Sequence, residues 1–215
     1  MGQLRVTEIF LSLQGETSFV GLPTAFVRLT GCPLRCNYCD TAYAFSGGQL
    51  LSLSDILDRL AEYESISNVT VTGGEPLAQE ECSAFLNMLC DHSYRVSLET
   101  SGALDVSGVD SRVSKIVDFK TPGSGEVGRN SWDNLVYCGP NDQIKFVICD
   151  RKDYEWVKLK CDQYQLFDFP GEVLFSASWG QLEYRSLAEW ILEDRLPVRM
   201  QPQLHKIIWG EVPGR

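Results

Sequence analysis

Three cysteines in the first fifth of the chain have the type and spacing of metal ligands. Cys32, Cys36 and Cys39 lie in the segment GCPLRCNYCDT, with three and then two residues between them. Thiolates favour soft centres, chiefly zinc, Cu(I) and iron–sulfur clusters. A structural zinc site takes four ligands, and the two histidines, His92 and His205, lie far away in the sequence. A cubane iron–sulfur cluster held by three thiolates would instead leave one iron open for another molecule. Such a cluster, or a zinc knuckle with a distant fourth ligand, is compatible with this spacing.

The segment Gly73-Gly74-Glu75-Pro76 is a second candidate feature, and it directly follows an apolar run. Two glycines allow a tight backbone turn and the close approach of a ligand. Glu75 could accept a hydrogen bond from a bound ammonium group, and Pro76 is well suited to begin a helix. Alone, the segment is most typical of an ordinary turn between a strand and a helix. Beside the three cysteines, it indicates a ligand site.

The elements that must position these residues alternate along the chain. Segments rich in β-branched or aromatic residues predict strands at Leu4–Phe10, Thr24–Thr30, Asn68–Thr72, Tyr94–Leu98, Lys115–Phe119, Gln143–Cys149, Glu172–Phe175 and Pro197–Met200. Helical patterns occur in an apolar stripe from Leu53 to Ala61, at Leu77–Asp91, at Asp150–Tyr164 with Asp150 as its N-cap, and after a capping box formed by Ser186 and Glu189. Strands that alternate with helices predict βαβ units and a largely parallel sheet.

Polar residues collect just after the C-terminal ends of these strands. The sets are Cys32–Cys39, Gly73–Pro76, Glu99–Gly102, Asp118–Thr121, Ser176–Ser178 and Gln201–His205. In a parallel barrel or an open α/β sheet, the carboxyl ends of the strands share one face. The pattern therefore predicts an active site on that face.

Composition restricts the class of protein. The net charge is −10, from 19 Lys and Arg against 29 Asp and Glu, so no nucleic-acid partner is expected. The first residues lack the basic and apolar regions of a signal peptide, and no apolar run approaches the ~18 residues of a membrane span. We expect a cytoplasmic protein without membrane contact, with its other cysteines reduced.

The CxxxCxxC spacing after a strand, with GGEP one strand later, resembles the radical S-adenosylmethionine superfamily. Longer stretches are similar to its 7-carboxy-7-deazaguanine synthase family, namely Leu11–Thr41, Glu99–Gly102, Asp118–Glu126 and Gln201–Lys206. The resemblance implies an α/β fold, a partial and mostly parallel (β/α) barrel with few helices, in a single domain of residues 1–215. It implies a carbon–nitrogen lyase that converts 6-carboxy-5,6,7,8-tetrahydropterin to 7-carboxy-7-deazaguanine with loss of ammonia. A 5′-deoxyadenosyl radical would take hydrogen from C6, and the product is a precursor of queuosine and other 7-deazapurines.

The same resemblance implies roles for individual residues. Cys32, Cys36 and Cys39 would hold a 4Fe–4S cluster, and Thr41 matches the magnesium ligand of the family. The residues expected to contact S-adenosylmethionine are Tyr38, Asp40, Gly74, Glu75, Gly102, Asp118, Lys120 and Ser176. The residues expected to contact the substrate are Leu13, Gln14, Gly15, Glu16, Arg28, Thr100 and His205. Glu16 would accept hydrogen bonds from the aminopyrimidine edge, and Arg28 would pair with the substrate carboxylate. The implied partners are an electron donor such as a flavodoxin and a second copy of the chain in a homodimer.

Two other functions fit parts of the pattern. A glycyl-radical activating enzyme also uses CxxxCxxC, but it would leave Arg28 and the Gln14–Glu16 segment without a role. A zinc-stabilised binding module would need no catalytic residues. The chain also departs from its implied family, in which Gly is common at the position of Thr17 and Pro at that of Ala177. The tail from Trp209 to Arg215 extends beyond the point where several members end, so no role follows for a terminal carboxylate.

Overall fold

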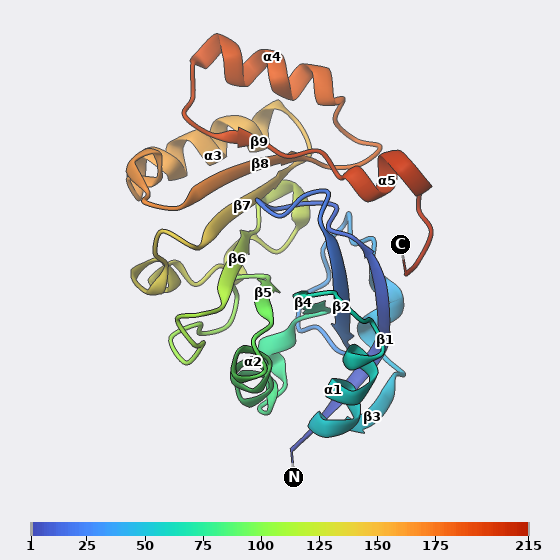
Figure 1. Cartoon of the computed structure of the whole chain (residues 1–215). Helices are drawn as coiled ribbons and strands as arrows, with labels where there is room; N and C mark the ends of the chain where they lie inside the picture. The colour runs from blue at the N-terminus through green and yellow to red at the C-terminus, as the bar shows by residue number, and fades with distance from the viewer. Residues whose placement is uncertain (1, 215) are drawn as a thin grey trace.

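The computed structural model describes residues 2–214, which form a single curled sheet with helices on its outer side (Figure 1). The strand order in this part of the chain is β3-β1-β2-β4-β5-β6-β7-β8-β9. The strands are β1 (Gln3–Leu13), β2 (Pro23–Leu29), β3 (Gln49–Ser52), β4 (Asn68–Gly73), β5 (Arg95–Thr100), β6 (Ser114–Phe119), β7 (Gln143–Ile148), β8 (Glu172–Ala177) and β9 (Arg199–Met200). Strand β1 is antiparallel to β2 and β3, and every pairing from β2 to β9 is parallel. The expected partial, mostly parallel barrel is confirmed.

Each half of the sheet has its own apolar core beneath its own helices. The helices are α1 (Leu53–Ala61), α2 (Cys82–Asp91), α3 (Arg151–Gln163), α4 (Tyr184–Asp194) and α5 (Leu204–Trp209). One cluster joins β1–β5 to α1 and α2, with Phe85 and Leu86 fully buried. The other joins β6–β9 to α3 and α4, with Phe146 and Phe175 at its centre. The outer face of the sheet is thus occupied by packing, and the inner face and strand ends are left for a site. No helix in residues 2–214 is long and apolar enough to cross a membrane.

Several predicted boundaries differ from the structure. Helix α2 begins at Cys82 because Pro76–Ala78 first forms a separate 3-10 turn. The capping box at Ser186 was wrong: α4 begins two residues earlier, at Tyr184, and has no side-chain cap. The prediction for α3 was right, since Asp150 accepts a hydrogen bond from the Asp153 amide at 2.9 Å. Strand β3 and helix α5 were not predicted.

After β9, the chain crosses back to the N-terminal part of the sheet. Residues 201–209, here called the C-terminal strap, leave β9 and cross to the loop between β1 and β2 (Figure 1). The Gln201 amide bonds to the Phe175 carbonyl in β8 at 2.8 Å, and the Leu204 amide bonds to the Gly15 carbonyl at 2.9 Å. The strap therefore joins β8, near one edge of the sheet, to the loop between β1 and β2, near the other edge.

Candidate active site

The cysteine loop, residues 31–41, follows β2 and packs against the glycine turn that follows β4. The Glu75 amide bonds to the Gly31 carbonyl at 2.8 Å. A Cβ placed on Gly74 would lie 2.1 Å from the Gly31 oxygen and 2.9 Å from the Cys32 Cβ, so only glycine allows this approach. All three cysteines line one cavity of about 640 Å³ and are half-buried. The GGEP turn is thus a backbone support for the cysteine loop.

The donor set fits an iron–sulfur cluster with one open corner. Burial raises the pKa of the Cys32 thiol and raises that of Cys36 to about 11, so a soft metal centre must displace these protons as it binds. All eight cysteines are free of disulfides. Within residues 2–214, no three His, Cys, Asp or Glu side chains are grouped to hold a single metal ion. The thiolates of a cubane cluster each bind a different iron, so they need not share one ion.

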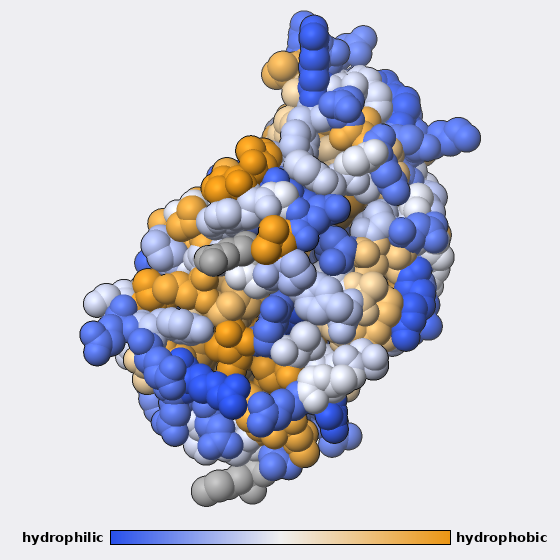
Figure 2. Space-filling view, turned by 90° about the vertical axis from the view of Figure 1, so that its right-hand side faces the viewer, coloured by the Kyte–Doolittle hydropathy of each residue, from blue (hydrophilic) through white to orange (hydrophobic). Residues whose placement is uncertain are grey.

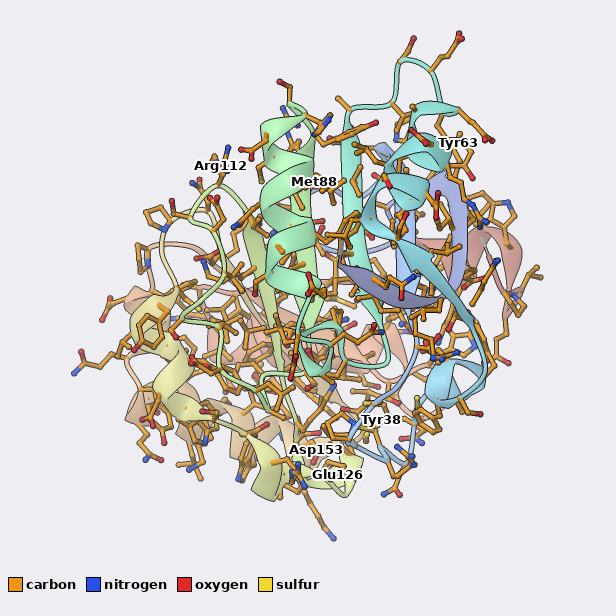
Figure 3. The ribbon with its side chains drawn as sticks, turned by 90° about the horizontal axis from the view of Figure 1, so that it is seen from below. Tyr38, Tyr63, Met88, Arg112, Glu126 and Asp153 are labelled. Atoms are coloured by element: carbon orange, nitrogen blue, oxygen red, sulfur yellow. The ribbon has the colours of Figure 1, made fainter. Side chains whose placement is uncertain are left out.

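A second loop, residues 121–126, supports the cysteine loop from the side of β6. The backbone N–H of Asn37 donates to the Ser124 carbonyl at 2.9 Å, and the backbone N–H of Arg35 donates to Glu126 Oε1 at 2.6 Å. Asp153, at the start of α3, fixes this loop in turn, because it accepts bonds from Thr121 Oγ1 and the Gly123 amide, both at 2.8 Å. Figure 3 labels Tyr38 in the cysteine loop, Glu126 in loop 121–126 and Asp153 in α3, and shows the three close together. Residues from three parts of the sequence therefore position the thiols.

Buried charged side chains of alternating sign line the cavity beyond the cysteines. Lys120 Nζ lies 3.1 Å from Asp118 Oδ2, and Lys145 Nζ lies 3.9 Å from the same oxygen. Lys145 also forms an ion pair with Glu16. Burial opposes the charge of Glu16, but the charge and hydrogen bond of Lys145, together with Gln203 and His205, lower the pKa of this carboxyl group. Burial and the charge of Glu16 raise the pKa of Glu99, so the pKa values of the two carboxyl groups are shifted in opposite directions.

Polar groups from β1, β2 and the strap complete the cavity. Arg28 donates from Nε to Glu8 at 2.6 Å, and its guanidinium lies 5.7 Å from the centre of the Phe10 ring. Gln14 Nε2 lies 3.3 Å from Glu99 Oε1. A Cβ on Gly15 would lie 2.0 Å from the ring Nδ1 of His205, so the strap packs directly on the glycine. Burial lowers the pKa of His205, which favours its neutral form.

All but three of the residues predicted for the site line this cavity. The exceptions are Glu75, Gly102 and Ser176. The Glu75 carboxylate is fully buried and accepts bonds from Thr100 Oγ1 at 2.9 Å and from the Ser101 amide at 2.7 Å. Gly102 has a left-handed backbone, with φ of 70°, where a side chain would meet Val117. Ser176 donates to the Gln201 carbonyl at 2.9 Å. These three residues therefore lie behind the cavity lining, where their packing and hydrogen bonds hold the lining residues in place.

The structure also adds residues that were not predicted for the site. Lys145 and Glu99 line the cavity, as does Lys206 from α5. Glu99 and Lys206 lie inside the segments ETSG and QPQLHK, whose similarity to the family could have indicated that they belong to the site. Lys145 gave none, because a single lysine in the strand QIKFVI is equally typical of a solvent-facing position.

Comparison with known proteins agrees with this arrangement. The family model described as the radical SAM superfamily matches residues 26–123, which include the cysteine loop and the GGEP turn. Over 210 residues the chain is 44% identical to the 7-carboxy-7-deazaguanine synthase of Chlorobaculum tepidum, covering 96% of this chain and 94% of that protein. The chain belongs to the 7-carboxy-7-deazaguanine synthase family. The family member of Koribacter versatilis is 42% identical over 219 residues, covering 96% of this chain and 97% of its own.

The solved structures agree in fold. The crystal structure of QueE from Escherichia coli has a TM-score of 0.77 to this chain and covers 94% of it and 95% of its own chain, at 22% identity. At that identity the likeness concerns the fold alone. It supports the curled, open sheet as the architecture of this chain.

Proposed function

We propose that this protein is a lyase, acting as a single domain, that converts 6-carboxy-5,6,7,8-tetrahydropterin to 7-carboxy-7-deazaguanine with loss of ammonia. The observation that carries the proposal is one cavity that has the three cysteines in one wall and Gln14, Glu16 and Arg28 in another. The names of the relatives agree with this assignment. An activating enzyme for a glycyl radical would need an open groove for a protein, whereas the charged residues here are buried.

The cofactors proposed are a 4Fe–4S cluster on Cys32, Cys36 and Cys39, S-adenosylmethionine and Mg²⁺. When bound, the cluster and S-adenosylmethionine supply a radical that takes hydrogen from C6 of the substrate. The residues proposed to contact S-adenosylmethionine are Tyr38, Asp40, Gly74, Asp118 and Lys120. Glu75, Gly102 and Ser176 do not line the cavity, and they would support these residues through packing and hydrogen bonds. Thr41 would bind Mg²⁺ through its hydroxyl, which here donates to Asp40 Oδ1 at 2.8 Å. Magnesium keeps several waters and takes substrate oxygens, so one protein oxygen is enough.

The chain's own residues would bind and orient the substrate. Glu8 holds the Nε of Arg28, and the rest of the guanidinium can pair with the substrate carboxylate. Glu16 would accept from the aminopyrimidine edge, with Leu13, Gln14, Gly15, Thr100 and His205 around it. The apolar side chains of Phe10, Phe26 and Val147 line the same cavity and would exclude water from a reactive radical.

The proposed partners are an electron donor such as a flavodoxin and a second copy of the chain, in the cytoplasm. Figure 2 shows the side of the molecule that carries β1, β3 and α5, where hydrophobic patches interrupt the hydrophilic surface. The exposed apolar residues on these elements are Leu11, Leu50, Ile207 and Ile208. Apolar surface of this kind is a candidate contact for a homodimer. Sedimentation of the purified protein measures the oligomeric state directly.

The decisive experiment is an assay of the anaerobically purified, reconstituted protein. Reduced protein is incubated with S-adenosylmethionine and the tetrahydropterin, and the deazaguanine acid is sought by mass. We expect four irons per chain, cleavage of S-adenosylmethionine and the product acid. A colourless protein with one zinc per chain would overturn the proposal in favour of a binding module. Cleavage of S-adenosylmethionine without the acid would point to another radical enzyme.

A further inference from the structure

Lys145 makes a contact that no role described so far explains. It lies in β7, and its side chain crosses the inside of the curled sheet to Glu16, which is 129 residues earlier in the sequence. The side chains of both residues are 12% exposed. A buried ion pair costs desolvation energy, so a chain that keeps one here places both charges at a defined point.

The other polar groups around Glu16 and Lys145 come from three parts of the fold. Gln203 Nε2, from the strap, donates to Glu16 Oε1 at 2.8 Å, and His205 lies nearby. Glu99 from β5 is close enough to feel the charge of Glu16, and Asp118 from β6 lies 3.9 Å from Lys145. In residues 2–214, Lys145 is the one cation in an ion pair with Glu16. Without it, buried Glu16 would lose its ion-pair partner and still have the Glu99 carboxyl group nearby.

We propose that Lys145 is a positioning residue for substrate recognition, because it holds Glu16 as a fixed, ionised acceptor for the paired N–H donors of an aminopyrimidinone edge. This inference rests on the proposed function. An ionised carboxylate accepts two hydrogen bonds side by side, as this edge requires, whereas a protonated one must use an oxygen as a donor. Lys145 thus acts through Glu16 and contacts no reacting atom.

The pKa shifts of Glu16 and Glu99 are consistent with Glu16 as the ionised acceptor. Lys145 lowers the pKa of Glu16 against the effect of burial, while burial and Glu16 raise the pKa of Glu99. The opposite directions of the two shifts agree with Glu16 as the charged acceptor of the pair. Loss of Lys145 would remove the opposing cation and raise the pKa of Glu16. The acceptor would then be lost at neutral pH and regained as the pH rises.

Binding of two stable probes tests the inference without turnover. The probes are 6-carboxypterin, which has the donor edge, and 6-carboxylumazine, in which a carbonyl replaces the 2-amino group. Affinities are measured by fluorescence titration of the reconstituted holoenzyme without reductant. We expect the wild type to prefer the pterin by about tenfold or more, the value of one good charged hydrogen bond. In Lys145→Met this preference should fall towards one, and pterin affinity should rise as the pH is raised, because Glu16 then ionises. Lys145→Arg should restore the wild-type preference.

Matched variants separate this role from a loss of structure. Lys158→Met breaks a comparable ion pair with Asp194, of 2.6 Å, on the outer side of the fold and should keep the wild-type preference. Glu16→Gln should lose the preference as Lys145→Met does, and the double variant should lose no more than Glu16→Gln alone. If Lys145→Met does not fold, that last comparison still decides, because the double variant buries no unpaired charge.

Two outcomes overturn different statements. If Lys145→Met keeps the wild-type preference and its affinity does not change with pH, the role of Lys145 is wrong. An additional loss in the double variant would equally show that Lys145 acts other than through Glu16. If the wild type binds neither probe and makes no product from the tetrahydropterin, the proposed function itself fails.

Discussion

Lys206 Nζ lies 2.6 Å from Asp40 Oδ2, and this ion pair joins the last helix, α5, to the cysteine loop. Lys206 is almost fully buried, while the Asp40 side chain is 42% exposed. Asp40 also accepts from the hydroxyl of its neighbour Thr41. The loop that carries the three thiols is therefore held by loop 121–126 on one side and by the strap on the other.

Replacement of Lys206 by Met should loosen the cysteine loop. Because Asp40 is partly exposed and water screens its charge, we expect a loss of only about 1–2 kcal/mol in the free energy of unfolding. Iron should leave the reconstituted variant faster in the presence of a chelator. Arg185→Ala, which removes an exposed ion pair with Glu189, is the control and should change neither quantity. Equal iron release from both variants would show that the ion pair does not hold the loop.

Asp153→Ala should weaken the same loop from the opposite side. The side chain of Asp153 is buried, and its loss would leave the backbone amides of Gly123 and Cys149 without their acceptor and remove one of the two acceptors of the Thr121 hydroxyl. We expect a loss of about 2–4 kcal/mol by urea denaturation, together with reduced iron retention. Asp150→Ala, which removes the N-cap of the same helix, should cost about 1 kcal/mol and keep the iron. Full iron retention in Asp153→Ala would contradict the support assigned to loop 121–126.

Cys36→Ala should abolish both the cluster and the cleavage of S-adenosylmethionine. Three thiolates from one loop are the minimum that leaves a single corner open, so two should not retain the cubane. Iron content and visible absorbance after anaerobic reconstitution measure the loss. Cys90→Ala is the matched control, since Cys90 is also half-buried but lies on α2, away from the cavity. A Cys36→Ala protein that keeps four irons would rule out the proposed ligand set.

Arg28→Ala should separate radical formation from product formation. The arginine lines the substrate side of the cavity and is held by Glu8, so its loss should spare the cysteine loop. We expect cleavage of S-adenosylmethionine to continue uncoupled, while the deazaguanine acid falls by about a hundredfold or more, as for a lost charged contact. Both products are quantified by mass in the same reaction. Normal turnover by Arg28→Ala would refute the assignment of the substrate carboxylate to this residue.

The sequence predicted the strands and the shared face better than the side chains that act on it. Segments such as Gln143–Cys149 and Glu172–Phe175 are nearly continuous apolar runs, broken only by Gln143, Lys145 and Glu172, which is the pattern of strands covered on both sides. Strand β3 was not predicted because its sequence, QLLS, is short and follows two glycines. Helix α5 has only six residues, and no side chain caps its N-terminus.

Long-range pairs were beyond the reach of any local pattern. Glu75 looked like a free acceptor, yet Thr100 and Ser101, from the next strand, occupy its carboxylate. No local pattern singled out Lys145, because its partner Glu16 lies on a distant part of the chain. Only the sheet order brings such residues together, and the resemblance to the family named ligands without naming what holds them in place.

The strap has a consequence for how the protein is made. A wall of the cavity consists of residues from both ends of the chain, and it forms only when Leu204 reaches Gly15. On the ribosome, the thiols emerge early, whereas Gln201 and the residues after it emerge last. At ordinary rates of translation, this interval lasts on the order of ten seconds. During this interval the three thiols are already made, whereas Lys206, which pairs with Asp40 of the cysteine loop, is not.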